Sequence, residues 1–537
     1  MQYIAAHEEK LGQYYPKAVF DYLQNAAELK PFYETYPNLE GYGEIIKNRR
    51  FSFENRKVLH KVLTTQYGDL LQQPNGAAVQ KNIDALLDDN TFTITTGQQI
   101  HIYLGPLYVA YKILTTIARC CWLEENFKGH KFVPVFWMAT EDHDFEEISH
   151  LNLYNREFKW PQTEGFAGAV GRLSPATINN LEADIAALVQ NDEEAKKLLA
   201  MFTDAYAKYP TLADATRAVT HQLFGHTGLV VIDADDKELK QQFIPYIKDD
   251  IFKGQNVGVV SKTSEQLGQN YKTQIHPRDI NFFYLTDNSR TRIVKEENTF
   301  KVLDSDVVFD EAVLRNEIVT NPEKFSPNVI MRPLYQEVIL PNLAYVGGPA
   351  EVNYWFQLKE MFGINGVQFP ILELRKSLIV LNEKTVEKIA SIGFAPVDFM
   401  SDEKELEAAF LADNTVESLD LSAHYKTIAT ELETIKSAAL GMDANLKPFI
   451  EGEFKRITET FEKLDNKLEK VSKRSVEGQL KVIETVKTKF FKPGALSERV
   501  DTILSVPQLS DEKVIGNLIK TFNHENKPLI ILLPPLV

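Results

Sequence analysis

A dense cluster of ionisable side chains follows an apolar run at residues 133–139. The acidic loop, residues 140–150, reads TEDHDFEEISH and carries seven ionisable side chains. His143 lies between Asp142 and Asp144. An imidazole held by a carboxylate can act as a general base or a proton shuttle, and grouped carboxylates can hold a divalent ion through their oxygens. We predict that Asp142, His143 and Asp144 are catalytic, and we name no residue as a specific metal ligand.

The acidic loop also has a purely structural interpretation. Asp144 could cap the start of a helix through its side chain, and Glu147 could complete a capping box three residues later. The other charged side chains would then face water. The sequence leaves both interpretations open, although so many charges directly after a buried run favour the catalytic one.

A second loop, residues 95–106, reads TTGQQIHIYLGP and precedes a predicted helix. Backbone N–H groups at a helix start, with the positive end of the helix dipole, can hold a phosphate or a carboxylate. The loop matches neither the GxGxxG nor the Walker motif, and Pro106 could simply occupy the first helical position. We predict that this loop binds a ligand through Gly97, Gln98, Gln99 and Gly105.

Two further segments combine cations with glycine. Arg332 offers a planar fork that suits a carboxylate, and a pair of glycines at 347–348 precedes another predicted helix. Each feature also has a structural alternative. Arg332 could pair with an acid inside the protein, and the glycines could form a tight turn. The basic pair Arg375 and Lys376 could be ordinary surface residues. The predicted binding residues are Arg332, Gly347, Gly348, Glu351, Arg375, Lys376 and Ser377.

These residues need a scaffold, and the surrounding pattern predicts a parallel sheet. Residues 91–95 form a β-rich run, residues 106–125 are helical, and residues 132–139 form a second apolar run. This is a βαβ unit, the building block of parallel sheets. Two more buried strands are expected at 229–232 and 367–372. Ligands of open α/β sheets bind beyond the carboxyl ends of the strands, where the candidate loops begin.

Residues 401–490 have a different pattern, because glycine and proline nearly vanish there. Apolar residues recur at alternating spacings of four and three, which is typical of a coiled coil. The alternation slips near Gly441 and Pro448, so we expect an antiparallel hairpin of two long helices; one continuous helix is the alternative. The apolar positions are Ile428, Leu432, Ile435, Ala439, Met442 and Leu446, then Ile450, Phe454, Ile457, Phe461, Leu464, Leu468 and Val471.

The composition excludes several classes of protein. The chain has 537 residues with 59 Lys and Arg against 75 Asp and Glu, a net charge of −16. This balance repels phosphate backbones, so we expect no nucleic-acid partner. The longest apolar run, residues 529–537, is too short to span a membrane, and the first ten residues lack the apolar core of a signal peptide. We therefore expect a cytoplasmic protein without a membrane partner.

Taken together, these segments resemble the cysteine ligases, or cysteine-adding enzymes, of bacillithiol biosynthesis. The resemblance spans nearly the whole chain, and VPVFWMATEDHDFEEI at 133–148 is its most specific part. It also rests on residues 97–99 with 105–108, 212–214 with 228–230, 332–333 with 347–351, and on the coiled coil.

The resemblance implies a core like that of class I aminoacyl-tRNA synthetases, in which residues 97–106 take the place of the HIGH motif and residues 375–377 that of KMSKS. The implied fold is α/β: a Rossmann-like parallel sheet with connecting insertions, plus an α-helical antiparallel coiled-coil domain. We expect an N-terminal helical region at 1–90 that packs on the core, a nucleotide-binding core at 91–395 with an insertion at about 155–225, a coiled-coil domain at 396–490, and a C-terminal segment at 491–537 that returns to the core.

The resemblance also implies the reaction, in which L-cysteine is joined through an amide bond to glucosaminyl malate. A carboxylate is a poor electrophile at neutral pH, so we expect activation by ATP, with Mg²⁺ as a candidate companion ion. A homodimer through the coiled coil is expected. The alternatives are another class I synthetase-like nucleotidyltransferase and a non-catalytic coiled-coil binding protein; the acidic loop argues against the second.

Overall fold

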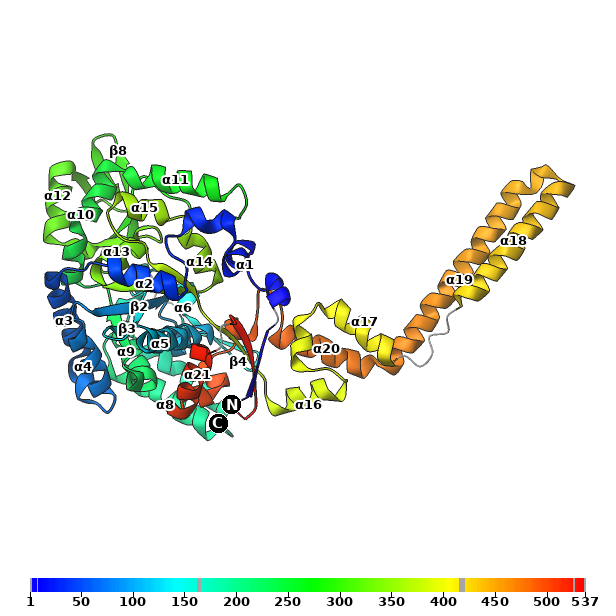
Figure 1. Ribbon diagram of the computed structural model, residues 1–537, viewed down its shortest axis with the longest axis horizontal. Coiled ribbons are helices and arrows are strands. Elements are labelled where there is room, and N and C mark those ends of the chain that lie inside the picture. The colour runs from blue at the N-terminus through cyan, green and yellow to red at the C-terminus, as the bar shows by residue number, and fades with distance from the viewer. Residues whose placement is uncertain (1, 7, 162–165, 415–420, 525–526, 536–537) are drawn as a thin grey trace. The chain divides into compact units, whose positions relative to one another are not determined.

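The computed structural model describes residues 2–6, 8–161, 166–414, 421–524 and 527–535 (Figure 1). The chain forms two compact units. The first comprises Met1–Val380 together with Pro493–Val537, and the second comprises Leu381–Lys492. No helix in the described ranges is both long enough and apolar enough to cross a membrane.

The first unit is built on a five-stranded parallel sheet of order β13-β12-β2-β3-β6. Its strands are rich in β-branched and aromatic residues and are buried on both faces, as expected for a parallel sheet covered by helices. Strands β2 and β3 pair along their whole length, from Thr91 opposite Lys131 to Gln98 opposite Met138. The strand bounds are β2 Thr91–Gln98, β3 Lys131–Met138, β6 Val230–Asp233, β12 Asn342–Gly347 and β13 Ile371–Leu374.

The predicted α/β fold class is confirmed, and so are the strands expected at 91–95, 132–139 and 229–232. Two details differ from the prediction. The strand expected at 367–372 begins only at Ile371, because residues 367–370 have no regular structure. Strand β12, which lies between β13 and β2, was not predicted as a strand. Pro341 and the glycines at 347–348 bound this short segment, so no local pattern marks it as a strand.

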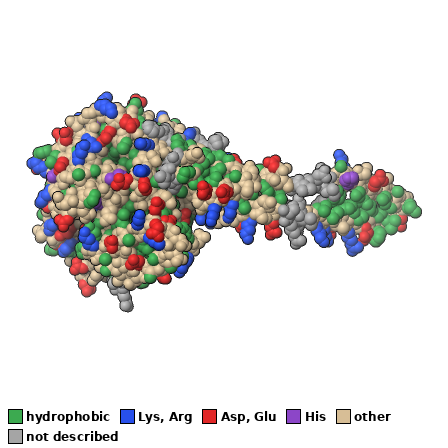
Figure 2. Space-filling view, turned by 90° about the horizontal axis from the view of Figure 1, so that it is seen from below, with side chains coloured by type: hydrophobic (Ala, Val, Ile, Leu, Met, Phe, Trp, Pro, Cys, Tyr) green, Lys and Arg blue, Asp and Glu red, His purple; other side chains and the backbone are tan. Residues whose placement is uncertain are grey.

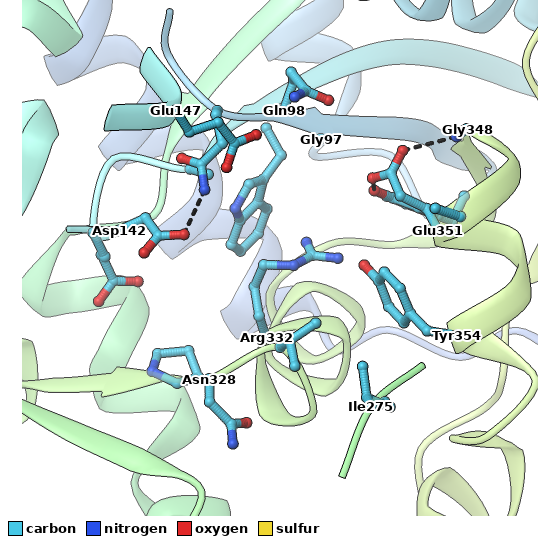
Figure 3. Close-up of a pocket in the computed structure, with 18 of the residues that line it drawn as sticks. Gly97, Gln98, Asp142, Glu147, Ile275, Asn328, Arg332, Gly348, Glu351 and Tyr354 are labelled. Atoms are coloured by element: carbon cyan, nitrogen blue, oxygen red, sulfur yellow. Dashed lines mark hydrogen bonds between the residues drawn. The ribbon is translucent and has the colours of Figure 1, made fainter. Parts of the chain in front are cut away.

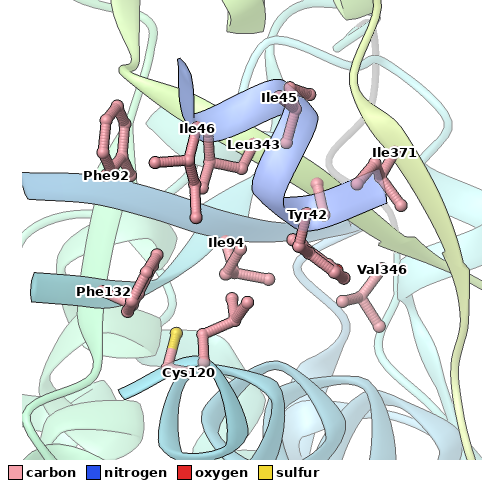
Figure 4. Close-up of a cluster of buried hydrophobic side chains, with 12 residues drawn as sticks. Tyr42, Ile45, Ile46, Phe92, Ile94, Cys120, Phe132, Leu343, Val346 and Ile371 are labelled. Carbon is pink, nitrogen blue, oxygen red and sulfur yellow. The ribbon is translucent and has the colours of Figure 1, made fainter. Parts of the chain in front are cut away.

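Helices α2 (Leu39–Asn48) and α5 (Tyr108–Asn126) pack on the parallel sheet and form much of its core (Figure 4). Tyr42 and Ile45 of α2 and Cys120 of α5 contribute side chains to the same cluster as Ile94 of β2. Burial of such side chains is the main source of stability in a core of this kind. The cluster also contains Ile46, Phe92, Leu123, Phe132, Leu343, Ala344, Val346 and Ile371.

A second, antiparallel sheet of order β10-β9-β8-β7-β11 was not anticipated from the sequence. Its strands are short and carry few apolar residues outside the buried positions, so their alternation is weak. The sheet matters for function because β8 and β11 border the pocket described below. The strand bounds are β7 Phe282–Leu285, β8 Arg290–Glu296, β9 Thr299–Val302, β10 Val308–Asp310 and β11 Phe325–Pro327.

A third, small sheet brings distant parts of the chain together. Strand β15 (Leu529–Leu533) pairs antiparallel with β1 (Gln2–Ala5) and parallel with β14 (Ser377–Val380). Helix α21 (Glu512–His524) packs on α5. Residues after the helical unit thus complete the first unit. A two-stranded ribbon, β4 (His150–Leu153) with β5 (Arg156–Lys159), follows the acidic loop.

The remaining helices of the first unit surround these sheets. Among the described residues, the region predicted to be helical at 1–90 contains four α-helices, and the insertion expected at about 155–225 contains three. The bounds of these remaining helices are α1 Lys17–Leu23, α3 Phe53–Tyr67, α4 Gly76–Ala85, α6 Phe145–Ile148, α7 Glu182–Val189, α8 Glu193–Lys208, α9 Leu212–Phe224, α10 Lys237–Lys253, α11 Gln255–Leu267, α12 Glu311–Thr320, α13 Met331–Ile339, α14 Pro349–Trp355 and α15 Lys359–Ile364.

The second unit is helical and contains the antiparallel hairpin predicted from the heptad spacing. Helices α18 (Ser422–Met442) and α19 (Lys447–Ser475) are joined by a short turn at 443–446. Tyr425 stacks on Phe461 with ring centroids 5.0 Å apart, and Lys436 pairs with Glu451 at 3.5 Å. The other helices of this unit are α16 Glu383–Ser391, α17 Glu403–Asn414 and α20 Glu477–Phe490.

Candidate active site

A pocket of about 700 Å³ opens at the carboxyl edge of the parallel sheet (Figure 3). Its walls come from the residues that follow β2, β3, β12 and β13, and from the edge of the antiparallel sheet. This volume is within the range of small-molecule and cofactor sites. The charged and aromatic residues that line it include Tyr108, Lys112, Trp137, Glu141, Asp142, Glu147, Arg278, Arg290, Arg332, Tyr345, Glu351, Tyr354, Arg375 and Arg499.

The pocket lies at the topological switch point of the sheet. Strands β3 and β6 continue from β2 in one direction, whereas β12 lies on the other side of β2. The connections leaving β2 and β12 therefore diverge, and a crevice forms between them. Gly97 at the end of β2 lines this crevice. A Cβ atom added there would lie 3.5 Å from the Tyr345 hydroxyl and 3.7 Å from Arg332 Nη1, both of which line the pocket.

Lys112 and Glu351 form an ion pair at the base of the crevice. Lys112 Nζ lies 2.6 Å from Glu351 Oε2 and also donates to Gln98 Oε1 and to the carbonyl of Gly97. Glu351 further accepts from the Tyr345 hydroxyl at 2.5 Å. Burial raises the pKa of Glu351, but Lys112 and these hydrogen bonds hold it below its usual value. Glu351 is therefore an anion with most of its acceptor positions filled.

Arg332 of α13 is the central cation of the pocket. Its guanidinium lies 5.8 Å from the ring centroid of Trp137 and 5.5 Å from that of Tyr345. Nη1 donates to Gln336 at 3.2 Å, whereas Nη2 is buried without a hydrogen-bond partner among the described residues. A buried donor without a partner is costly, so this atom is suited to an anionic or carbonyl oxygen of a ligand.

Asp142 is held as an anion by three neighbours. It accepts from the Gln99 side chain, from Arg290 Nη1 at 3.2 Å and from the backbone N–H of His143 at 2.8 Å. Burial raises its pKa, but the hydrogen bonds from His143 and Gln99 and the charge of Arg290 bring that pKa well below its usual range. Asp142 is therefore an acceptor and a counter-ion, and not a proton donor, at neutral pH.

His143 and Asp144 have positions different from those of Asp142. His143 Nδ1 lies 3.0 Å from Arg290 Nη1 and 3.3 Å from Asp142 Oδ1, so the ring is held between these two charged groups. Neither His143 nor Asp144 lines the pocket. Asp144 caps α6 by accepting from the backbone N–H of Glu147 at 3.1 Å. The capping interpretation of Asp144 agrees with this geometry.

Glu147 is a third carboxylate of the acidic loop that borders the pocket, in addition to Glu141 and Asp142 (Figure 3). Its side-chain oxygens accept no hydrogen bond from the described residues. Burial and the nearby charges of Asp144, Asp142 and Glu351 raise its pKa to about 7. A carboxyl group with such a pKa can take up or release a proton near neutral pH.

Residues 375–377 lie at the junction of β13 and β14 and mostly point into the protein. Arg375 Nη2 lies 2.6 Å from Glu498 Oε1, and both side chains are nearly inaccessible. Lys376 Nζ donates to the carbonyl of Lys527 at 3.0 Å, and Ser377 Oγ donates to Glu498 at 3.1 Å. Only Arg375 of the three lines the pocket.

Comparison with known proteins identifies the family. Residues 2–376 match the N-terminal Rossmann-like domain of bacillithiol biosynthesis BshC, and residues 378–533 match its C-terminal coiled-coil domain. The chain belongs to the BshC family. The relative from Flavobacterium johnsoniae is 37% identical over 90% of this chain and 91% of its own. Relatives from Flavobacterium psychrophilum and Cytophaga hutchinsonii are 36% and 35% identical, over 94% and 96% of this chain and 94% and 97% of their own.

All three relatives carry the name "Putative cysteine ligase BshC". The resemblance drawn from the sequence is therefore confirmed at the level of the family, and the relatives' name supports a ligase. The two matched domains also agree with the observed fold, a Rossmann-like parallel sheet and a separate helical hairpin.

In this BshC chain, eight of the residues proposed from the sequence meet in one pocket. They are Gly97, Gln98, Gln99, Asp142, Arg332, Gly348, Glu351 and Arg375. Gly105 and Gly347 have structural positions instead. Gly105 has a φ of +68°, and a Cβ there would lie 2.6 Å from His101 Cβ, so the glycine permits a tight turn. Gly347 is the last residue of β12.

The sequence reasoning missed several pocket residues of this BshC chain. Lys112 lies inside a helix, and Arg290 lies on a strand of the unanticipated sheet, so neither follows a predicted strand. Arg278 and Arg499 come from distant loops. One signal was available: Lys112 is the single charged residue in the otherwise apolar and neutral first half of α5.

The described part of the BshC chain holds no group of three or more His, Cys, Asp or Glu side chains arranged to bind a metal ion. The carboxylates of the acidic loop are dispersed: Asp142 faces Arg290, Asp144 caps a helix, and Glu141 pairs with the buried Lys240. These pairings explain why a charge-rich loop need not be a metal site.

Proposed function

We propose that this protein joins the carboxyl group of L-cysteine to the amine of glucosaminyl malate by an amide bond, forming bacillithiol with the help of ATP. The family match carries the proposal. It is supported by a pocket at the switch point of the sheet, which is lined by both cationic side chains and hydrogen-bond acceptors. Two charged substrates require both kinds of group.

Amide formation has two requirements. The cysteine carboxylate must gain a leaving group, which ATP supplies either as an acyl-adenylate, with release of pyrophosphate, or as an acyl phosphate, with release of ADP. The attacking amine must lose a proton, after which the new C–N bond forms and AMP or phosphate leaves. Charge stabilisation and positioning then account for most of the catalysis.

The cations of the pocket fit these anionic groups. The unpaired Nη2 of Arg332 offers a donor at the centre of the crevice, next to the loop that begins at Gly97. Lys112 is already engaged by Glu351, so it stabilises the crevice more than it adds net charge. Any Mg²⁺ in the reaction is expected to be carried by the nucleotide phosphates, because Glu141, Asp142 and Asp144 of the acidic loop have other partners.

The base that deprotonates the amine has two candidates. His143 is the candidate from the sequence, but it lies outside the pocket lining, and its Nδ1 is close to both Arg290 Nη1 and Asp142 Oδ1. Glu147 borders the pocket, has no hydrogen-bond donor among the described residues, and has a pKa raised to about 7. We therefore propose Glu147 as the general base and Asp142 with Arg290 as the ion pair that positions the loop.

We also propose that the helical hairpin forms a homodimer. Hydrophobic side chains gather over it in Figure 2. Met442 is 88% exposed and Phe449 is 68% exposed, which is unusual for side chains of this size on a monomer. A cytoplasmic location remains a prediction that cell fractionation can test.

A thermal-shift panel with ATP, ADP, L-cysteine and glucosaminyl malate tests the function. A ligand at one hundred times its Kd adds roughly 2.7 kcal/mol of stability. We expect stabilisation by glucosaminyl malate and by an adenine nucleotide with Mg²⁺, and bacillithiol detected by mass spectrometry when all substrates are combined. Stabilisation by nucleotides alone points to another nucleotidyltransferase, and no shift with any of them points to a non-catalytic protein.

A further inference from the structure

A short segment after the helical unit returns to the pocket and forms part of its wall. Glu498 is almost fully buried and accepts from Arg375 Nη2 at 2.6 Å and from the backbone N–H of Leu378 at 3.1 Å. At the other end of this segment, the carbonyl oxygen of Asp501 accepts from the backbone N–H of Leu107 at 2.8 Å. Residues 498–501 are thus fixed at both ends.

Arg499 lies between these two anchors and is exposed in the pocket. Its guanidinium is 5.9 Å from the ring centroid of Tyr108, and that of Arg375 is 5.4 Å from the same ring. The Arg499 guanidinium makes no hydrogen bond or ion pair with a described residue, whereas its backbone N–H donates to the carbonyl of Leu496 at 2.8 Å. The segment is therefore firmly held while its cation remains available.

Arg375 adds a second donor. Its Nη1 and Nη2 atoms are occupied by Lys376, Ser377 and Glu498, whereas Nε is buried without a hydrogen-bond partner among the described residues. The side chain is only 3% exposed. Nε faces the pocket near Gly348, where an added Cβ would lie 3.8 Å from it.

We propose that Arg499 and the Nε–H of Arg375 form an oxyanion-binding subsite beside Tyr108, which holds a carboxylate or phosphate group of the substrates. This inference rests on the proposed function and names the part of the pocket that takes the anion. Glu498 neutralises Arg375, so Arg499 supplies the net charge. Arg375 supplies a directed hydrogen bond, because its other N–H groups are committed.

The surrounding charges are compatible with an anion here. The carboxylate nearest to Gly348 is Glu351, which is already paired with Lys112. Glu147 also borders the pocket, but its raised pKa leaves it partly protonated near neutral pH. Neither group pairs with Arg499, so its guanidinium can still attract an anion to this wall.

Calorimetry with the full-length protein at low salt tests the subsite. The probes are L-malate, inorganic pyrophosphate and glucosaminyl malate, and the variants are Arg499→Ala and Arg499→Lys. Arg156→Ala is the matched control, because Arg156 is likewise exposed over an aromatic ring, 5.3 Å from the centroid of Phe158, but lies outside the pocket. Thermal unfolding of each variant verifies its fold.

We expect Arg499→Ala to bind at least one probe tenfold or more weakly, Arg499→Lys to be intermediate because an ammonium lacks the planar fork, and Arg156→Ala to match the wild type. A loss confined to pyrophosphate assigns the subsite to nucleotide phosphates, and a loss with malate and glucosaminyl malate assigns it to the malyl carboxylates. Wild-type affinity of Arg499→Ala for every probe overturns the subsite but leaves the proposed function standing. Absence of binding to the wild type by all three probes overturns both.

Discussion

Lys112 Nζ lies 2.6 Å from Glu351 Oε2, and this ion pair joins helix α5 to helix α14 beneath the pocket. The lysine side chain is 1% exposed and the glutamate side chain 24%. The two helices come from positions far apart in the chain, so the pair links the βαβ unit predicted from the sequence to the strand that was not predicted.

Lys112→Met is expected to destabilise the protein by about 3 kcal/mol, because it leaves the partly buried Glu351 carboxylate without its counter-ion. Denaturant unfolding at pH 7 measures the loss. The pair Lys112→Met with Glu351→Gln should recover most of the stability, since no charge then remains unpaired. A double variant no more stable than the single one contradicts this account.

The same ion pair predicts a pH dependence. The folded-state pKa of Glu351 is lowered, so its contribution to stability is present above the unfolded pKa and is lost as the pH falls through the folded value. Wild-type unfolding free energy should therefore decrease below about pH 4 more steeply than that of the Lys112→Met and Glu351→Gln double variant. Parallel curves for the two proteins rule out this contribution.

Glu147→Gln is expected to lower bacillithiol formation by about 10²-fold, the usual scale of general-base catalysis. In the wild type the rate should rise as the pH increases through about 7, because the base acts when it is deprotonated. The variant should lose this rise. His143→Ala is the comparison. If it loses more bacillithiol-forming activity than Glu147→Gln does, His143 and not Glu147 is the general base.

The Glu147→Gln substitution is also expected to change the melting temperature. A carboxyl group with a raised folded-state pKa penalises the folded state once the unfolded chain has lost its proton, above about pH 4.5. Removing this group should raise the melting temperature at pH 8 and leave it nearly unchanged at pH 4. A variant that is destabilised at pH 8 shows that the carboxylate has a structural role.

Asp144→Asn is expected to retain activity and stability, because asparagine caps a helix nearly as well as aspartate. Asp144→Ala should cost about 1 kcal/mol through loss of the bond to the backbone N–H of Glu147. Activity and thermal unfolding are measured together. A large loss of turnover in a fully stable Asp144→Asn protein supports the catalytic role predicted from the sequence.

Leu464→Lys with Leu468→Lys is expected to convert the proposed homodimer into monomers, because both side chains are exposed on α19 and continue its apolar spacing. Light scattering measures the mass. Thr427→Lys with Thr434→Lys is the matched control, since it adds the same charge at exposed polar positions of the hairpin. If the leucine variant is still a dimer, the dimer interface lies on another surface.

The parts of the fold that the sequence predicts are those with one dominant period. Strands β2 and β3 follow each other through a helix, and the hairpin repeats its apolar residues over many turns, so each can be recognised locally. The antiparallel sheet lacks such a period. Strand β12 contains Asn342 and Gly347 within a short buried segment, so its place in the sheet depends on pairing with β2 and β13, which no local pattern reveals.

The candidate site divides in the same way. Gly97 and Asp142 directly follow predicted strands, and the rule for parallel sheets brings them together. Lys112, Arg290 and Arg499 reach the pocket from a helix, from the second sheet and from a returning segment, so only the tertiary structure unites them. Which residue of the acidic loop faces the pocket also depends on the tertiary fold, because Arg290 from the second sheet contacts His143.

The order of the parts along the chain affects how the protein is made. Residues 381–492 form the helical unit, and the residues that carry Glu498, Arg499 and β15 follow it, although they belong to the first unit. Ribosomes add roughly 5–20 residues per second, so a nascent chain waits on the order of ten seconds between completing Arg375 and gaining its partner Glu498. During this interval a buried cation lacks its counter-ion and strand β14 lacks its neighbour. Binding at the proposed oxyanion subsite is therefore expected only after the helical unit has been translated.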